Sequence, residues 1–122
     1  MMISNSRSLA LNNRFFGISS ALAYIDRNFS EEIFMTDVAK AAFMSISTFY
    51  ICFKTLMGVT PNYYIIRLRI EKAKSMLKFT DDPIGKVGSE CGFSDFAYFC
   101  QIFKREVGMT PKKFRIRNKI LF

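Results

Sequence analysis

Apolar side chains recur along much of this chain at the spacing of one helix face. In the segment FGISSALAYIDRNFSEE they fall at Ile18, Leu22, Ile25 and Phe29, which predicts a first helix that packs against the residues after it. The stretch after Pro61 has apolar Ile66, Ile70, Ala73 and Leu77 on one face and no internal Gly or Pro. This pattern predicts one long amphipathic helix from Pro61 to Lys78 and an all-α fold.

An internal repeat with an offset of 50 residues organises the chain. The segment SISTFYICFKTLMGVTPNYYIIR, from Ser45, aligns with DFAYFCQIFKREVGMTPKKFRIR, from Asp95. Ser45 and Asp95 are good N-cap residues, and Gly58 and Gly108 suit the left-handed position after a helix. A Thr-Pro pair then supplies the next N-cap in each copy. Each copy therefore predicts a helix, a sharp stop and a second helix.

A shorter helical stretch precedes each copy. Thr36 is the predicted cap of TDVAKAAF, and Asp82 followed by Pro83 opens PIGKVGSECG. A small residue, Ala39 or Gly88, lies where two helices would cross, and a short turn leads into the main helix. This is a helix-turn-helix pattern, and it occurs twice.

The repeat divides the chain into five predicted parts. They are a loosely ordered lead at 1–15, a first helix-turn-helix subdomain at 16–59, a linker helix at 60–80, a second subdomain at 81–117 and a tail at 118–122. The long helix would extend about 27 Å at 1.5 Å per residue. One turn of B-DNA is ~34 Å, so two recognition helices could enter successive major grooves.

The charge of the chain favours an anionic partner. Lys and Arg number 18 against 10 Asp and Glu, a formal charge of +8. The windows Ser45 to Thr80 and Phe96 to Lys119 hold thirteen of the basic residues and only two acidic ones. The positive charge thus belongs to the repeats rather than to a disordered tail.

Composition also excludes several function classes. Histidine is absent, which removes His-dependent triads and most mixed zinc sites, and the glycines are spaced wrongly for a phosphate-binding loop. Three cysteines without a C-x-x-C pair fit a reducing cytosol, and no apolar run approaches the roughly 18 residues of a membrane span. We therefore expect a cytoplasmic protein that is not an enzyme, with no metal, no cofactor and no membrane partner.

The outward faces of the two main helices are the predicted DNA-reading surfaces. They carry Ser47, Tyr50, Ile51 and Lys54 in the first copy and Ala97, Cys100, Gln101 and Lys104 in the second. Gln101 can make a bidentate hydrogen bond to adenine. Apolar surface for thymine methyl groups comes from Tyr50, Ile51 and Ala97, so the two helices together favour A·T-rich targets. The predicted phosphate contacts are Thr48, Lys54, Tyr98, Lys104, Arg105, Lys112 and Lys113.

Most of the 14 phenylalanines are expected in the core, since they recur at helical spacing. In the first main helix the predicted buried stripe is Phe49, Cys52, Phe53 and Leu56, and in the second it is Phe99, Ile102, Phe103 and Val107. Ile46 is expected at the edge of the core. Phe96 could either pack in the core or contact DNA. Cys52 and Cys91 are expected to be small buried hydrophobes, with Cys100 on the outward face.

The segments TPNYYIIRLRIEKAKSML and CGFSDFAYFCQIFKREVGMTPKKFR resemble the signature of the AraC/XylS transcription regulators. The resemblance covers roughly Ile18 to Arg117. It implies seven helices, two helix-turn-helix subdomains joined by the long helix, and a monomer that activates transcription by contacting RNA polymerase. It places base contacts at Ser47, Tyr50, Ile51, Phe96, Ala97, Cys100 and Gln101. Gly88 departs from the family's usual alanine, which should cost helix stability by up to about 1 kcal/mol.

Two other interpretations remain open from the sequence. The chain could be a non-catalytic adaptor or anti-activator whose exposed helices bind a protein. A membrane-active cationic protein is less consistent with the pattern, because the basic residues lie in capped repeats rather than along one amphipathic stripe.

Overall fold

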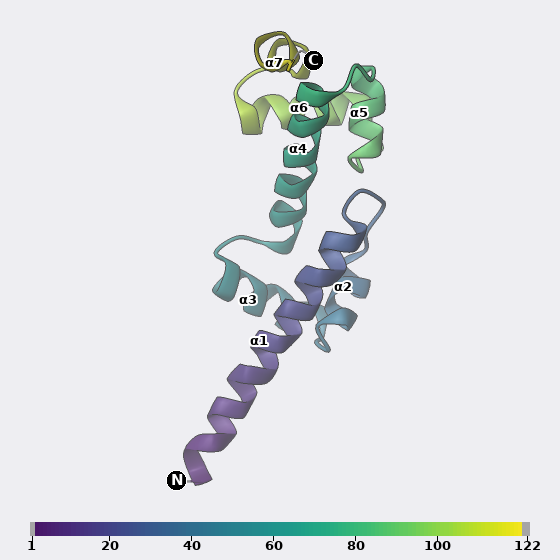
Figure 1. The fold of residues 1–122 in the computed structure, drawn as a ribbon. Coiled ribbons are helices and arrows are strands. Elements are labelled where there is room, and N and C mark those ends of the chain that lie inside the picture. Colours follow the sequence, from purple (N-terminus) through teal and green to yellow (C-terminus); the bar gives the residue numbers. More distant parts are fainter. Residues whose placement is uncertain (1, 121–122) are drawn as a thin grey trace. The chain divides into compact units, whose positions relative to one another are not determined.

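The computed structural model describes residues 2–120, with side chains from residue 11 onward. Over this range the chain forms seven helices and no strand (Figure 1). The helices are α1 (Met2–Asn28), α2 (Met35–Ala41), α3 (Ile46–Met57), α4 (Pro61–Phe79), α5 (Ile84–Glu90), α6 (Phe96–Val107) and α7 (Pro111–Asn118). The predicted all-α fold with a long helix after Pro61 is confirmed.

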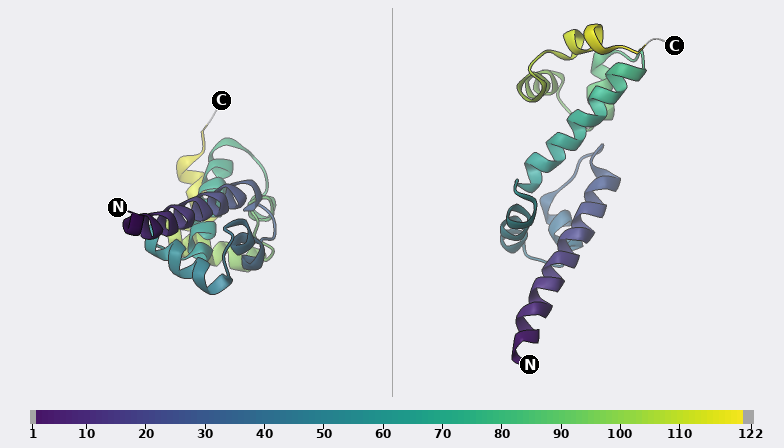
Figure 2. Two further views of the ribbon diagram at one scale, coloured as in Figure 1. Left: turned by 90° about the horizontal axis from the view of Figure 1, so that it is seen from below. Right: turned by 60° about the vertical axis from the view of Figure 1, so that its left-hand side comes forward.

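The helices form two compact units, each with its own core. The first contains α1, α2, α3 and the beginning of α4 as far as Tyr64. The second contains α4 from Ile65, then α5, α6, α7 and the short segment Phe29–Glu32. Helix α4, which is continuous in the views of Figure 2, therefore contributes residues to both units. The five boundaries expected from the sequence stay a prediction.

The first unit is held together by α2 and α3, which pack against α1. Its core contains Ile25 of α1 and Val38 of α2, with Phe49 and Phe53 of α3, all without solvent exposure. The beginning of α4 adds the ring of Tyr64, whose centroid lies 5.6 Å from that of Phe53. These contacts fix the orientation of α3 and leave its other face to solvent.

The second unit repeats this arrangement around α6. Helix α5 packs on α6 and α6 on α7. Phe99 and Phe103 of α6 are fully buried, and the ring of Phe114 from α7 lies 5.5 Å from that of Phe103. Gly88 of α5 faces Phe99 so closely that a Cβ atom there would lie 2.6 Å from a ring carbon. A side chain at position 88 would therefore overlap the ring of Phe99. The sequence alone did not reveal this reason for a glycine where the family usually has alanine.

The predicted stops of the main helices are confirmed, whereas the caps of the short helices are different. Gly58 and Gly108 follow α3 and α6 with φ of 80° and 90°. Helix α2 begins at Met35 behind Phe34, which makes no side-chain cap, so Thr36 already lies inside the first turn. The prediction of Thr36 as a cap was wrong. At α5 the cap residue is Pro83, again without a side-chain hydrogen bond.

Helix α1 begins earlier than the apolar spacing indicated. It is helical from Met2, whereas the sequence placed its start near Phe15. Residues 2–14 contain neither Gly nor Pro, so nothing in them stops a helix from continuing upstream. The order of the lead at 1–15 stays a prediction.

Fewer phenylalanines are buried than the sequence predicted. Six of those described are exposed, namely Phe15, Phe16, Phe34, Phe43, Phe79 and Phe96. Most of them lie at helix ends or in connections, where the spacing of one helix no longer decides which residues are covered. Leu56 and Ile46 are also exposed, at 50% and 42%, so both predictions of burial were wrong.

Candidate nucleic-acid interface

Helix α3 presents a solvent-facing surface whose N-terminal end is fixed by a side-chain cap. The backbone N–H of Thr48 donates to the hydroxyl of Ser45 (3.3 Å), which occupies one of the free donors of the first turn. Behind this cap Ser47, Thr48, Ile51 and Lys54 are exposed. The structure thus leaves four of the predicted contact residues on α3 open to solvent.

Tyr50 is held differently from its neighbours on α3. Its side chain is half-buried, and its hydroxyl donates a hydrogen bond to Oδ1 of Asn62 in the first turn of α4. Its ring lies edge-on to that of Phe49, 6.2 Å between centroids. The sequence analysis did not identify Asn62 as a candidate site residue. The second copy of the repeat has Lys112 at the equivalent position, and this difference between the copies could have drawn attention to Asn62.

A shallow hollow lies beside Tyr50 on this face. It has a volume of about 480 Å³ and is lined by Tyr50, Ile51, Lys54, Thr55 and Thr60. Ile51 keeps 68% of its surface exposed here. The hollow therefore combines apolar surface with one cation.

Helix α6 has a stronger cap and a more polar outer face. The carboxylate of Asp95 accepts hydrogen bonds from the backbone N–H groups of Ala97 (2.8 Å) and Tyr98 (3.2 Å). Gln101, Lys104 and Arg105 are exposed, as is the whole predicted set on this helix apart from Cys100. Phe96, which the sequence left open, is 57% exposed at the first turn.

Cys100 is half-buried and packs against the core of the second unit. Burial raises the pKa of its thiol, which disfavours the reactive thiolate. Cys52 and Cys91 are buried as predicted. Burial also raises the pKa of Cys91, to about 11.

The basic residues fall into two groups with different surroundings. Lys112 and Lys113 lie exposed in the first turn of α7, and neither has an ion pair within residues 2–120. Lys54 is exposed on α3 and Lys104 on α6, and Arg105 contacts Glu106 (3.0 Å). These five cations are the ones predicted to contact phosphate.

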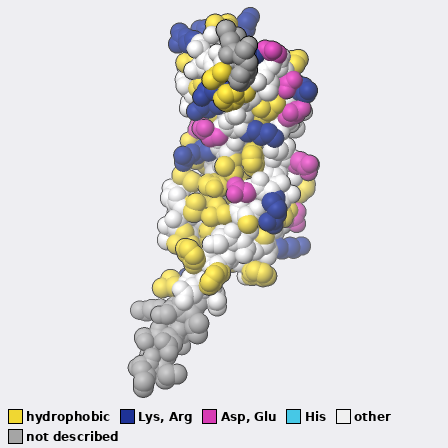
Figure 3. Space-filling model, viewed as in Figure 1, with side chains coloured by type: hydrophobic (Ala, Val, Ile, Leu, Met, Phe, Trp, Pro, Cys, Tyr) yellow, Lys and Arg dark blue, Asp and Glu magenta, His cyan; other side chains and the backbone are white. Residues whose placement is uncertain are grey.

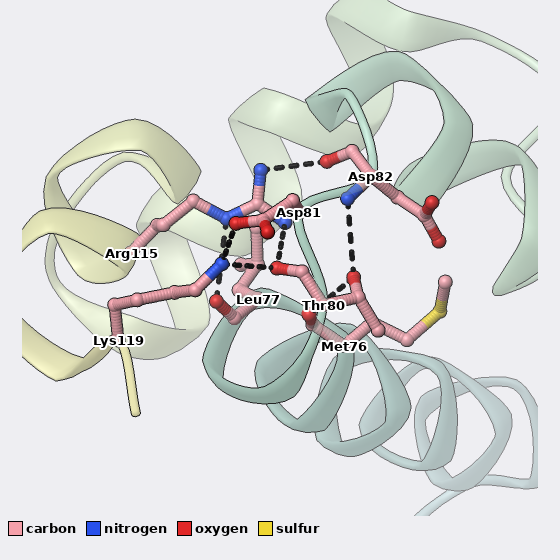
Figure 4. Close-up of polar contacts among 7 residues, drawn as sticks. All are labelled: Met76, Leu77, Thr80, Asp81, Asp82, Arg115 and Lys119. Atoms are coloured by element: carbon pink, nitrogen blue, oxygen red, sulfur yellow. Dashed lines mark hydrogen bonds and ion pairs between the residues drawn. The ribbon is translucent and has the colours of Figure 1, made fainter. Parts of the chain in front are cut away.

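Other cations of the second unit bind its own backbone. Arg115 of α7 donates to the carbonyl oxygens of Leu77 (3.2 Å), Thr80 (3.2 Å) and Asp82 (2.6 Å), at the C-terminal end of α4 (Figure 4). Lys119 donates to the Thr80 carbonyl (2.8 Å) and to Asp81. The hydrogen bond and the charge of Lys119 lower the pKa of the Asp81 carboxyl.

A second set of such contacts holds the segment Phe29–Glu32. Arg69 donates to the carbonyl oxygens of Phe29 (2.7 Å) and Glu31 (3.0 Å), and Lys72 to Ser30 Oγ (2.9 Å). The sequence counted these cations with the DNA-facing charge. Arg69 and Lys72, like Arg115 and Lys119, instead bind carbonyl and hydroxyl groups inside the second unit.

Apolar side chains are also exposed on the first unit. Figure 3 shows them gathered on the visible face of its helices, among scattered Lys and Arg side chains. A hollow of about 600 Å³ lies between α1 and the turn after α2, and the residues that line it include Arg14, Phe16, Phe43 and Met44. Among the described helices, none is long and apolar enough to cross a membrane.

The comparisons with known proteins identify one family. The family described as "Helix-turn-helix domain" matches residues 38–117. The chain is 31% identical over 105 residues to the HTH-type transcriptional activator RhaS of Enterobacter sp. (strain 638), covering 86% of this chain and 38% of that protein. The chain therefore spans less than two-fifths of the length of such curated relatives.

Two solved structures share the fold. An AraC-type DNA-binding domain-containing regulator from Chromobacterium violaceum superposes with a TM-score of 0.77 at 25% identity, over 84% of this chain and 91% of that one. The DNA-binding domain of AdpA, a global transcriptional factor, solved in complex with a target DNA, gives 0.77 at 26% identity, over 81% and 89%. Both are crystal structures of DNA-binding domains or of proteins that contain one.

Proposed function

Because this chain belongs to the AraC-type family of helix-turn-helix transcription regulators, we propose that it activates transcription by binding double-stranded DNA sequence-specifically. Helices α3 and α6 would enter successive major grooves, with α4 as the spacer between the units. Bases would be contacted by Ser47, Tyr50, Ile51, Phe96, Ala97, Cys100 and Gln101, and phosphates by Thr48, Lys54, Tyr98, Lys104, Arg105, Lys112 and Lys113.

The observation that carries this proposal is the repetition of one exposed surface. Helices α3 and α6 have side-chain caps at the same position, glycine stops at the same position and exposed residues 50 positions apart. Lys54 and Lys104 stand at equivalent places toward the ends of these faces. Side chains near the beginning of such helices reach base edges, and cations farther along meet phosphate.

The first turn of α7 supports a phosphate contact independently. Lys112 and Lys113 lie at the positive end of the helix dipole, where cations are unfavourable. A phosphate group at this position would offset the repulsion and would also be attracted by the positive end of the helix dipole. The two lysines therefore fit an anionic partner better than they fit the isolated unit.

The remaining parts of the proposal rest on the resemblance to this family. RhaS is an activator by its name, and we propose the same role here, with RNA polymerase as the second partner and a monomer on the DNA. Since its target would be the bacterial chromosome, the site of action would be the cytoplasm.

The direct experiment is to select bound duplexes from a random pool and then measure affinity against salt concentration. If about six phosphates are neutralised, the logarithm of affinity should fall with the logarithm of salt at a slope near −5. Lys104→Ala should weaken binding to all duplexes alike, whereas Gln101→Ala should relax the preference at one base pair. Lys40→Ala, on the exposed side of α2, is the matched control and should change neither property.

A second candidate function is an adaptor that binds protein. The exposed apolar residues of the first unit favour it, above all Phe43, which is 87% exposed and forms part of the 600 Å³ hollow. An adaptor would bind duplexes weakly and without sequence preference. A salt slope near zero, together with no enrichment of any sequence, would support this alternative against the first.

A further inference from the structure

The two recognition helices present different chemistry at equivalent positions. Ile51 of α3 corresponds to Gln101 of α6, and Tyr50 corresponds to Cys100. Gln101 can donate and accept hydrogen bonds, whereas an isoleucine can do neither. If both helices face base pairs, as the proposed function requires, they cannot read the same groups.

The hydroxyl of Tyr50 is the hydrogen-bonding group next to Ile51 in the sequence of α3 that could compensate for this difference, and it already makes a hydrogen bond. It donates to Oδ1 of Asn62, which fixes the phenol against the beginning of α4. A phenol has one hydrogen to donate. While this hydrogen bond persists, Tyr50 offers its ring to a ligand but no donor.

Ile51 is then the most prominent group on the middle of this face. It is 68% exposed beside the hollow of about 480 Å³, whose wall Tyr50 forms. Lys54 lies one turn further along, so the apolar group is next to a cation that suits phosphate. This pairing of charge with apolar surface fits the edge of the major groove, where the 5-methyl group of thymine is the apolar feature.

We propose that Ile51 reads the 5-methyl group of a thymine, and that the hydrogen bond between Tyr50 and Asn62 sets this preference by withholding the Tyr50 hydroxyl from the bases. Asn62, which lies outside the recognition helix, is on this view a positioning residue for specificity. The inference rests on the proposed function, and at the equivalent positions Ile51 and Gln101 it assigns hydrogen-bonded base recognition to α6.

The test replaces each thymine of a selected duplex, one at a time, by deoxyuridine. This keeps the base pair and removes only the methyl group. At one thymine the affinity should fall about fourfold, equivalent to ~0.8 kcal/mol for one buried carbon. Ile51→Ala should weaken binding and abolish the effect of uracil at that thymine alone. Ile116→Ala, which truncates an isoleucine that is 72% exposed on α7, should leave the uracil profile unchanged.

Three further variants test the role of the hydrogen bond. Tyr50→Phe should leave the base preference as it is, because the hydroxyl it removes does not face DNA. Asn62→Leu should release that hydroxyl and change the preferred base beside the thymine. Asn62→Asp keeps the accepting oxygen and should keep the preference, although its negative charge lowers the affinity for every duplex.

The outcomes separate this inference from the proposed function. A protein that binds its selected duplex with the expected salt dependence, but is indifferent to every uracil or stays sensitive to the same one after Ile51→Ala, would overturn the inference alone. A change of base preference in Tyr50→Phe would overturn the role of Asn62. Failure to select any duplex would remove both proposals.

Discussion

Gly92, in the turn between α5 and α6, combines a left-handed backbone conformation with close neighbours. Gly92 has a φ of 104°, and a Cβ atom there would lie 2.6 Å from the carbonyl oxygen of Phe29 and 2.8 Å from Nε of Arg69. Gly108 has a similar φ of 90° but open space around it. Alanine substitution at these two glycines therefore separates backbone strain from steric overlap.

The expected costs follow from these two surroundings. A positive φ costs a residue with a side chain about 1–2 kcal/mol, and the lower entropy of the unfolded chain returns about 0.5–1 kcal/mol. Gly108→Ala should thus lower the free energy of unfolding by about 1 kcal/mol. Gly92→Ala must also displace the hydrogen-bonded pair of Arg69 and Phe29, and such overpacking adds about 1–3 kcal/mol. We expect a total near ~3 kcal/mol.

Urea unfolding followed by helical circular dichroism measures both values by linear extrapolation. Equal slopes against urea would show that the two variants unfold from comparable native states. Should the two alanine variants differ by less than about 0.5 kcal/mol, the close approach of the segment Phe29–Glu32 to Gly92 would not exist in solution, and the reasoning would be refuted.

Three further predictions concern the stability of the protein. Gly88→Ala should destabilise the protein by about 1 kcal/mol despite the better helix propensity of alanine, because the new carbon overlaps the ring of Phe99; a stabilised variant in the same urea assay would contradict this. Phe43→Gly should stabilise by about 0.5 kcal/mol, since Phe43 has a φ of 59° and an exposed side chain; a lower thermal midpoint would argue against strain there. Arg115→Met should cost about 3 kcal/mol, as three carbonyl oxygens lose a charged donor, and an unchanged midpoint would show that water replaces it.

A prediction about thiol chemistry can be checked in the same preparations: with its pKa raised to about 11, buried Cys91 should react with thiol reagents at pH 8 only after unfolding. Rapid labelling of Cys91 in the folded protein would contradict it.

The sequence predicted those features that local chemistry decides. Ser45 and Asp95 accept hydrogen bonds from their own first turns, and Gly58 and Gly108 adopt the left-handed conformation. Each of these features depends on a few neighbouring residues, and the repeat of 50 residues showed each of them twice. The positions of these caps and glycines along the chain also predicted the order of the helices.

Contacts between distant residues were beyond such reasoning. The sequence could not show that Arg69 and Arg115 bind carbonyl oxygens more than 30 residues away, because a buried cation and a DNA-facing one look alike in a charge window. It could not show that Asn62 holds Tyr50, or that Phe16 and Phe43 stay exposed.

Helix α4 has a practical consequence for anyone who wishes to separate the two halves of this protein. A fragment that ends before Pro61 lacks Tyr64, whose ring packs against Phe53. A fragment that starts at Pro61 lacks the segment Phe29–Glu32, to which Arg69 and Lys72 donate hydrogen bonds. No single cut therefore gives two fragments that both keep all these contacts. Dissection requires overlapping fragments that both retain this helix, and the second must be supplied with residues 29–32 in trans or by fusion.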